Sequence, residues 1–431
     1  MPQYRQDVSK EKHTEGFSLS TNYTATQSNL SIVTNPGRHK SIVVTALIAS
    51  AAAAGYLTLE QDTQVQQTVI TQRLNLAVNG LITANYSNGL RLTPNTDLGL
   101  NATTDDFSLT IEGYIENVIT YGYISGGGAQ NVYKDEIQKF SFAANSNSVS
   151  VGDLTEARSW AAGQSSTISG YTSGGQNYAP YFGSDRIDKF SFSSDGDATV
   201  VGNLTQKREG PAGQSSTTHG YTSGGLDGTA PVQEFDIIDK FSYTSDGNST
   251  DVGDMTGERY YLAGQSSSTH GYTAGGSAIV SLAPDRVATI DKFSFASDGN
   301  ATSTGDLTET LTKLSGQSSP SHGYTSGGHG SINPNLTPLE QIGDSEDKSN
   351  IEQFSFASDG NAKETAELTT ARDSTTGTSS LTDGYAAGGI NDDSLATASV
   401  DKFSFASAES SVDAGNLTTS DYMYAAAGQQ S

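Results

Sequence analysis

A six-fold internal repeat spans residues 120 to 431 and constrains the fold of this 431-residue chain more than any other feature. Each copy contains Gly-Tyr followed, two residues later, by Gly-Gly. The copies begin at Gly122, Gly170, Gly220, Gly271, Gly323 and Gly384. Sequence self-similarity at a period of about 50 residues is typical of propellers and related repeat folds.

Three further segments recur in step with Gly-Tyr. Segments of the Lys-Phe-Ser-Phe type begin at Lys139, Lys189, Lys240, Lys292, Gln353 and Lys402. Segments of the Gly-Asp-Leu-Thr type begin at Gly152, Gly202, Gly253, Gly305, Ala366 and Gly415. Segments of the Gly-Gln-Ser-Ser type begin at Gly163, Gly213, Gly264, Gly316, Gly377 and Gly428. Four short strands in each unit predict a propeller blade, and stacking against neighbouring units would supply the core.

The phase of the repeat predicts how the ring closes. The first unit opens with a Gly-Tyr segment at Gly122, and the last ends with a Gly-Gln-type segment at Ala427 to Ser431. The final strand therefore has no Gly-Tyr partner after it in the chain. We expect it to pair with Tyr121 to Gly127, which would close the ring and remove two free sheet edges.

The amino-acid sequence of the unit from Arg259 to Thr308 resembles the kelch repeat, in which a double glycine ends the second strand of each blade. The resemblance implies an all-β chain whose residues 118–431 form a six-bladed kelch-like β-propeller closed by the C-terminal strand. Two features depart from the pattern. The only tryptophan is Trp160, and the arginine that opens most units is replaced by Leu311 and Asp421.

Residues 1–117 lack the repeat and show alternating apolar and polar segments, with Asn-Gly turns expected at Asn79 and Asn88. This pattern predicts an N-terminal β-sandwich that serves as a docking domain. The longest apolar run, Ile42 to Leu57, is shorter than the roughly 20 residues that a bilayer helix needs. We therefore expect strand and turn there, with no membrane insertion, and the polar start predicts no secretory signal.

Composition excludes several functions. A net charge of −25 argues against a nucleic-acid partner, because phosphate binding needs a cationic surface. The absence of cysteine excludes disulfides, thiolate metal sites and cysteine nucleophiles. Nearly every serine and acidic residue of the repeat region belongs to a repeated turn or strand. We therefore expect no enzyme activity, no catalytic residues and no cofactor.

Histidines at one repeat position are the strongest metal candidates. His219, His270 and His322 each precede Gly-Tyr, and three imidazoles can hold a metal. Equivalent hairpins of different blades lie far apart unless they line the axis, so no metal site is predicted. The Asp-Gly turns lack the spacing of a calcium loop.

The connection from Gly-Gly to Phe-Ser-Phe differs in every unit, whereas the other connections are nearly constant. Variable loops on a rigid scaffold commonly carry function. In a four-stranded blade these loops share one face with the connections that follow Leu-Thr. Aromatic side chains there can stack on sugars or fill protein pockets. The candidate ligand- or partner-binding residues are Tyr133, Tyr178, Tyr181, Phe182 and Phe235.

A small β-sandwich before a repetitive, Gly/Ser/Thr-rich domain is similar to virion structural proteins of tailed bacteriophages, in particular marine cyanophages. The resemblance implies a non-enzymatic virion protein, located on tail, fibre or head. Its N-terminal domain would bind other virion proteins, and its propeller would bind a host-surface glycan or protein, or a neighbouring virion protein. Self-association into a homo-oligomer is left open. The alternative is a soluble or extracellular carbohydrate-binding propeller, either a lectin or a glycan hydrolase.

Overall fold

The computed structural model describes the backbone of residues 3–7, 14–23, 30–33, 40–51, 55–62, 67–69, 74–76, 80–91, 97–102 and 107–117. It further describes residues 121–129, 132–177, 183–229, 231–280, 283–331, 345–407, 409–420 and 425–428. These residues form strands, turns and loops, with no helix among them, so the all-β class is confirmed for the described chain. Likewise, no helix within these ranges is long and apolar enough to cross a membrane.

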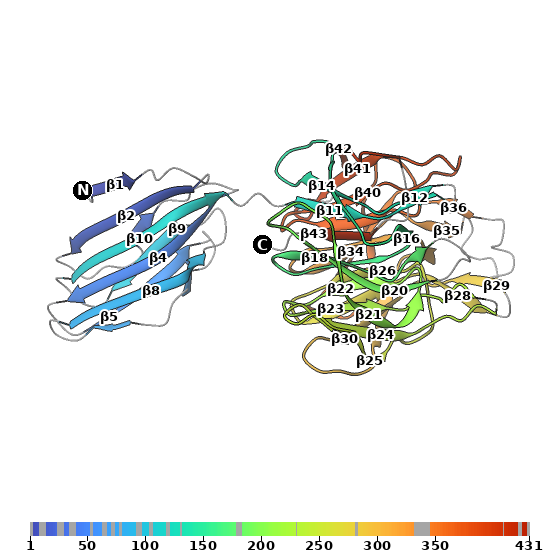
Figure 1. Ribbon diagram of the computed structural model, residues 1–431, viewed down its shortest axis with the longest axis horizontal. Coiled ribbons are helices and arrows are strands. Elements are labelled where there is room, and N and C mark those ends of the chain that lie inside the picture. Colours follow the sequence, from blue (N-terminus) through green and yellow to red (C-terminus); the bar gives the residue numbers. More distant parts are fainter. Residues whose placement is uncertain are drawn as a thin grey trace. The chain divides into compact units, whose positions relative to one another are not determined.

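The chain forms two compact units, Met1–Ile119 and Thr120–Ser431, and the predicted boundary fell between residues 117 and 118. The first unit contains two antiparallel sheets (Figure 1). One has the order β1 (Gln3–Asp7), β2 (Thr14–Tyr23), β10 (Phe107–Asn117), β4 (Lys40–Ala51), β8 (Gly80–Arg91). The other has the order β3 (Leu30–Val33), β9 (Asp97–Ala102), β5 (Gly55–Asp62), β6 (Gln67–Val69), with β7 (Leu74–Leu76) also paired to β5.

The apolar run of the first unit is strand, as the sequence predicts. Its described residues lie in β4 and in the start of β5, and β4 is flanked by β10 and β8 in the five-stranded sheet. The expected turn at Asn88 is wrong. Asn88 and Gly89 lie inside β8, where the pairing with β4 shifts register between Val44 and Ala46. Asn-Gly here accommodates an irregularity of the pairing rather than a reversal, because residues 86–89 of β8 lie opposite residue 45 of β4 and such extra residues also favour flexible backbone.

The second unit contains six four-stranded antiparallel sheets in its described residues. They are β43 (Ala425–Gly428), β11 (Tyr121–Ser125), β14 (Glu136–Ser141), β15 (Val149–Asp153); β17 (Ala162–Ser165), β18 (Ser169–Ser173), β20 (Ser184–Ser191), β21 (Thr199–Arg208); and β22 (Ala212–Ser215), β23 (His219–Ser223), β24 (Ile237–Ser242), β25 (Thr250–Asp254). The others are β26 (Ala263–Ser266), β27 (His270–Ala274), β30 (Thr289–Ser294), β31 (Thr302–Asp306); β33 (Ser315–Ser318), β34 (His322–Ser326), β37 (Asn350–Ser355), β38 (Lys363–Glu367); and β39 (Thr376–Ser379), β40 (Asp383–Ala387), β41 (Ser399–Ser404), β42 (Val412–Asn416).

Further short strands lie in the connections within and between these sheets. They pair as β12 (Gly128–Ala129) with β13 (Val132–Tyr133), β16 (Arg158–Ser159) with β19 (Gln176–Asn177), and β28 (Ser277–Val280) with β29 (Ala283–Arg286). A three-stranded sheet has the order β32 (Leu311–Thr312), β35 (His329–Ser331), β36 (Ser345–Asp347).

The tyrosine of each Gly-Tyr packs on the aromatic strand of the neighbouring sheet. The pairs are Tyr123 on Phe190 and Phe192, Tyr171 on Phe241 and Tyr243, Tyr221 on Phe293 and Phe295, Tyr272 on Phe354 and Phe356, Tyr324 on Phe403 and Phe405, and Tyr385 on Phe140 and Phe142. The last pair joins the sixth sheet to the first, with ring centroids 4.7 Å apart for Tyr385 and Phe142. Such contacts add to the apolar burial between sheets.

A polar contact also repeats between neighbouring sheets. The threonine of Leu-Thr donates to the side chain that precedes Lys-Phe-Ser-Phe in the next sheet, as Thr256 does to Asp291 through both its amide (3.0 Å) and its hydroxyl (2.7 Å). The final instance runs from the Thr418 amide to Gln138 Oε1 at 2.8 Å, again from the last sheet to the first.

The C-terminal strand pairs with the first strand of the repeat region, as the sequence predicts. β43 lies antiparallel to β11, with Gly428 opposite Gly122 and Ala425 opposite Ser125. The Gly-Gln strands contact one another in the order β43, β17, β22, β26, β33, β39, and β39 also contacts β43. This arrangement is that of a propeller-like fold (Figure 1).

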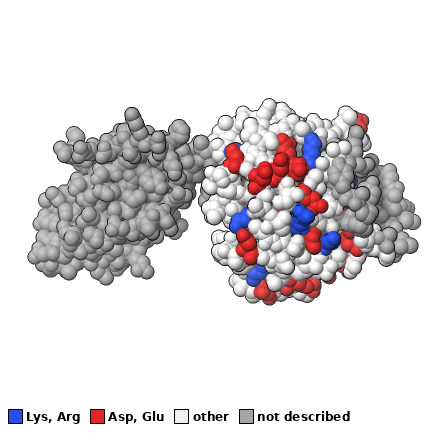
Figure 2. Space-filling model, viewed as in Figure 1, with Lys and Arg blue, Asp and Glu red and all other residues white. Residues whose placement is uncertain are grey.

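The arginine of the repeat forms a buried ion pair with an aspartate in four units. Arg158 contacts Asp188 at 3.0 Å and Arg372 contacts Asp401 at 3.2 Å, with these side chains almost fully buried. Arg208 with Asp239 and Arg259 with Asp291 form the equivalent pairs. On the surface, Lys139, Lys189, Lys240 and Lys292 each bind the aspartate of a neighbouring Asp-Gly turn. Figure 2 shows acidic residues with single basic residues beside them on the visible face of this unit.

Candidate ligand-binding site

The variable connections meet the segments that follow the repeat arginine. Backbone bridges join Glu209 to Leu226, Tyr260 to Ser277 and Asp373 to Ile390, and β16 pairs with β19 in the same way. In each case a residue just after the arginine position bonds a residue just after Gly-Gly. Both kinds of connection therefore lie at one end of the sheets, as the sequence predicts.

A ring of left-handed residues lies at this end. The residue two positions after the repeat arginine has a positive φ in the five units where it is described: Trp160 (55°), Gly210 (65°), Tyr261 (54°), Lys313 (56°) and Ser374 (56°). Amide-to-carbonyl hydrogen bonds of 2.8–2.9 Å run from each to the one before it, from Gly210 through Ser374. A left-handed tryptophan or tyrosine is a rare conformation, and such residues cluster at ligand sites.

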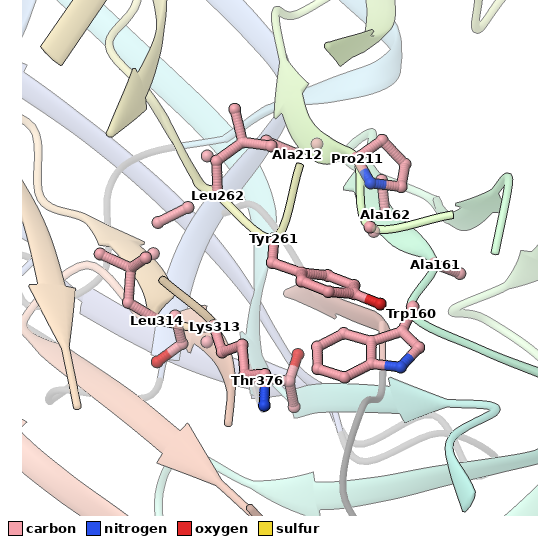
Figure 3. A pocket seen from close by; sticks show the side chains of 18 of the residues that line it. Trp160, Ala161, Ala162, Pro211, Ala212, Tyr261, Leu262, Lys313, Leu314 and Thr376 are labelled. Atoms are coloured by element: carbon pink, nitrogen blue, oxygen red, sulfur yellow. The ribbon is translucent and has the colours of Figure 1, made fainter. Parts of the chain in front are cut away.

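Four of the five ring residues, Trp160, Gly210, Tyr261 and Lys313, line a cavity of about 100 Å³, whose opening we call the channel mouth. Its lining includes Trp160, Tyr261, Lys313, Leu314 and Thr376, and Figure 3 shows these side chains gathered around one space. The cavity also reaches the glycines of the Gly-Gln strands. A site of this kind combines an aromatic surface, a cation and hydroxyl groups, which suits a small polar ligand.

Trp160 and Tyr261 form one aromatic surface although a unit lies between them. Their ring centroids are 4.2 Å apart and the rings are tilted by 36° (Figure 3). The intervening position is Gly210, where a Cβ atom would lie 2.5 Å from Cδ1 of Tyr261. Any larger residue at 210 would displace the tyrosine ring, so glycine is what allows the two rings to meet.

A buried carboxyl group lies behind this surface. Glu209 is 5% exposed, and the Tyr261 hydroxyl lies 3.5 Å from its Oε1. Burial is the main cause that raises the pKa of Glu209 to about 7, with Asp227 adding to the rise and hydrogen bonds from Tyr261 and Gln176 opposing it. The charge beside the aromatic surface therefore changes near neutral pH.

Glu209→Gln is expected to stabilise the chain at pH 8 and to change its stability little at pH 4.5. The folded state holds the Glu209 proton with a pKa of about 7 against 4.5 for the ordinary group, so wild-type stability falls as pH rises through this window. The glutamine side chain does not titrate, so the variant lacks this pH dependence of stability. The expected gain above pH 7 is about 3 kcal/mol, measured by urea unfolding. The control is Glu258→Gln at an exposed site, and equal pH slopes for Glu209→Gln and wild type would contradict the assignment.

Lys313, the cation at the channel mouth, contacts Asp373, which in turn lies near His329. Lys313 Nζ lies 3.3 Å from Asp373 Oδ2, and Asp373 is in turn 3.7 Å from Nδ1 of His329. The Lys313 side chain is 30% exposed, so its ammonium can contact a ligand in the cavity while Asp373 holds it in place.

The residues predicted from the sequence have different positions. Tyr133 is half-buried on β13, and its hydroxyl donates to Gln176 Oε1, which places it beside the Glu209 neighbourhood. Phe235 is only 6% exposed and lies 5.8 Å from the Arg208 guanidinium, so its ring packs over the buried ion pair instead of forming free surface. Tyr178, Tyr181 and Phe182 lie outside the described residues.

The three repeat histidines are bound locally. Nδ1 of His219 and His270 lies 2.8 Å from the hydroxyl of the preceding threonine, and Nδ1 of His322 lies 2.9 Å from Ser321 Oγ. Burial is the first cause that lowers the pKa of each. Each histidine thus caps its own hairpin.

Sequence reasoning missed Trp160, Tyr261 and Lys313. The signal was present in part, because this position differs in every unit whereas the glycine three residues after it is constant from Gly163 to Gly377, although the positions directly beside it vary too. It was overlooked because the longer connections vary more visibly.

The other end of the same channel is lined by the same residue types in successive units. A cavity of about 360 Å³ is lined there by the Gln and Ser of the Gly-Gln-Ser-Ser segments and by Thr217, Pro320 and Leu381. The side-chain amide nitrogens of the lining glutamines are already engaged, since Gln164, Gln214 and Gln317 each donate to a backbone carbonyl of the next sheet. The end with Trp160 is therefore the better candidate for specific recognition.

Comparison of the chain with protein-family models and with curated proteins gave no match. Among solved structures, that of YjhT is similar, with a TM-score of 0.53 and 9% sequence identity. The superposition covers 66% of this chain and 94% of YjhT. At this identity the likeness concerns the fold alone, and it supports a β-rich, propeller-like architecture.

Proposed function

We propose that the six sheets are the blades of a closed, six-bladed kelch-like propeller and that the two N-terminal sheets form a β-sandwich. Two contacts between the last and first sheets support closure, Tyr385 with Phe142 and Thr418 with Gln138, and each repeats a contact made between sheets that follow one another in the chain. In addition, the C-terminal strand β43 completes the first sheet by pairing with β11. A closed ring would leave no free edge on the inner strands.

On this scaffold the chain is a non-enzymatic recognition protein whose ligand binds at the channel mouth beside Trp160. The observation that carries the proposal is the left-handed ring, in which each described unit presents a different side chain at one point. A repeat that keeps its strands and varies this position, together with the connections beside it, concentrates specificity at this end of the sheets. Backbone strain is retained where the surrounding structure and a function both hold it.

A glycan is the ligand class that fits best. Trp160 and Tyr261 offer aromatic area that stacks on the apolar face of a sugar ring, while Lys313 and Thr376 offer hydrogen-bond donors to hydroxyls. This chemistry serves a virion protein that attaches to a host surface, and it equally serves the alternative of a free carbohydrate-binding propeller.

The virion role rests on the sequence resemblance to structural proteins of tailed phages. In this role residues 1–117 anchor the chain to other virion proteins and the propeller is displayed. The net charge of −25 favours a solvent-facing position without nucleic-acid contact. Mass spectrometry of purified particles should then find the chain at a fixed ratio to the other virion proteins.

Trp160→Ala is expected to weaken glycan or host-cell binding by roughly 30-fold, since loss of an aromatic anchor costs about 2 kcal/mol. The measurement is a glycan array followed by titration of the best ligand, with unchanged far-UV circular dichroism as the folding check. The matched control is Leu381→Ala, which lies at the other end of the channel and should bind as wild type does. Unchanged affinity of folded Trp160→Ala would refute recognition at this mouth.

A further inference from the structure

A histidine and two aspartates meet beside the channel mouth, in the unit that has Leu311 in place of the arginine. His329 on β35 lies directly opposite Asp347 on β36 in the antiparallel pairing. Asp373 arrives from a different segment, after β38, where its backbone bonds Ile390. Three separate stretches of chain thus bring their polar side chains to one point.

The distances among the three donor atoms suit a small metal ion. His329 Nδ1 lies 2.9 Å from Asp347 Oδ1 and 3.7 Å from Asp373 Oδ2, and all three atoms lie within 4.8 Å of one another. Zinc bonds of 2.0–2.2 Å in a tetrahedral site would place donors about 3.3–3.6 Å apart. The two distances to His329 bracket that value, so small side-chain rotations would complete the geometry.

The site carries more buried negative than positive charge. The Asp347 and Asp373 side chains are each only 4% exposed, and Asp392 lies next to them, accepting a 2.9 Å hydrogen bond from the Asp347 amide. Lys313 contacts Asp373 at 3.3 Å, and Asp347 lies 2.9 Å from the His329 imidazole. Buried carboxylates in such a group are stabilised by a bound cation.

Neighbouring groups hold the aspartates in orientation. The Ser374 hydroxyl donates to Asp373 Oδ1 at 2.6 Å, which leaves Oδ2 facing His329. Hydrogen bonds of this kind fix the ligands of metal sites and raise metal affinity.

We propose that His329 Nδ1, Asp347 and Asp373 bind one Zn²⁺ ion, with a fourth position open to solvent on the quarter-exposed histidine side. Imidazole nitrogen with two carboxylates is a donor set that zinc accepts, whereas calcium prefers oxygen donors alone. Binding requires Nδ1 without a proton: a neutral imidazole then carries its single proton on Nε2 with no net release, and an imidazolium gives up one proton per ion.

The test is titration calorimetry of the full chain, stripped with chelator, against ZnCl₂ and in parallel against CaCl₂. The expected result is one saturable zinc site, and the His329→Gln variant should lose more than the roughly 10–100-fold in affinity that loss of an outer hydrogen-bond partner costs. His322→Gln removes a histidine of the same unit that is hydrogen-bonded to Ser321, and it should titrate as wild type.

A second measurement uses the wild-type chain alone, so it does not depend on whether the variants fold. Wild-type chain loaded with Co²⁺ should show the intense visible absorption of a four-coordinate ion, and one equivalent of Zn²⁺ should abolish it. The proposal is overturned by the absence of saturable zinc heat in wild type, by zinc binding that folded His329→Gln retains, or by a calcium site stronger than the zinc site.

Discussion

Gly264→Ala is expected to destabilise the repeat unit by about 3 kcal/mol or more, the upper part of the range for overpacked cores. A Cβ atom at Gly264 would lie 2.2 Å from the carbonyl oxygen of Gly213 on the neighbouring Gly-Gln strand. The obstructing atoms belong to backbone, so no side-chain rotation relieves the clash. The strands β22 and β26 would have to separate.

The same contact passes around the inner strands, which amplifies the effect. A Cβ at Gly316 would meet the Gly264 carbonyl oxygen at 2.2 Å, and one at Gly377 would meet that of Gly316 at the same distance. A shift at one strand therefore presses on the next. The measurement is the guanidinium unfolding midpoint. Gly257→Ala is the control, because a Cβ there meets nothing within 4 Å, and equal midpoints for the two variants would contradict close backbone packing around the channel.

Arg259→Leu is expected to cost about 3–5 kcal/mol, because it leaves a buried carboxylate without its partner. The guanidinium also donates to the carbonyls of Gly275 (3.1 Å) and Thr289 (3.0 Å), which lose these donors. Asp291 keeps only the hydrogen bonds from Thr256. Stability is measured by urea unfolding.

A double-mutant cycle and a pH series sharpen this test. Adding Asp291→Asn to Arg259→Leu removes the orphaned charge and should recover much of the loss. Protonation would neutralise the buried carboxylate that has lost its cation, so the deficit of the single variant should shrink as pH falls. Arg186→Leu is the exposed control, where the pair with Glu156 should contribute less than about 1 kcal/mol. A pH-independent deficit would contradict charge burial as its cause.

The chain contains a natural version of this substitution. Leu311 occupies the arginine position, and the acidic partner there is Glu352, whose pKa is raised chiefly by burial. The Thr308 amide and hydroxyl each donate to Glu352 at 2.8 Å. A unit can therefore replace its arginine when the acid is longer and hydrogen-bonded, which a single Arg259→Leu change does not provide.

Much of the second unit follows from local pattern. Alternation in Phe-Ser-Phe, the turn residues and the repeat phase predict four strands per unit and the pairing of β43 with β11, and both are found. Phe235, which the sequence predicts as a binding residue, is 6% exposed and covers the Arg208 ion pair, a position to which its aromatic character is equally suited. The local sequence pattern shows that a residue is aromatic, but it does not determine whether its side chain is buried or exposed.

Strand number, turn chemistry and repeat phase depend on neighbours in the chain, so the sequence alone determines them for this protein. The left-handed ring, the meeting of Trp160 with Tyr261 across Gly210, and the approach of His329 to Asp373 depend on residues 44 to 101 positions apart. Those distances exist only once the sheets have packed, because packing fixes which backbone conformations are held and which side chains converge. The candidate binding site is thus a property of the tertiary structure, carried by a scaffold that the repeat already specifies.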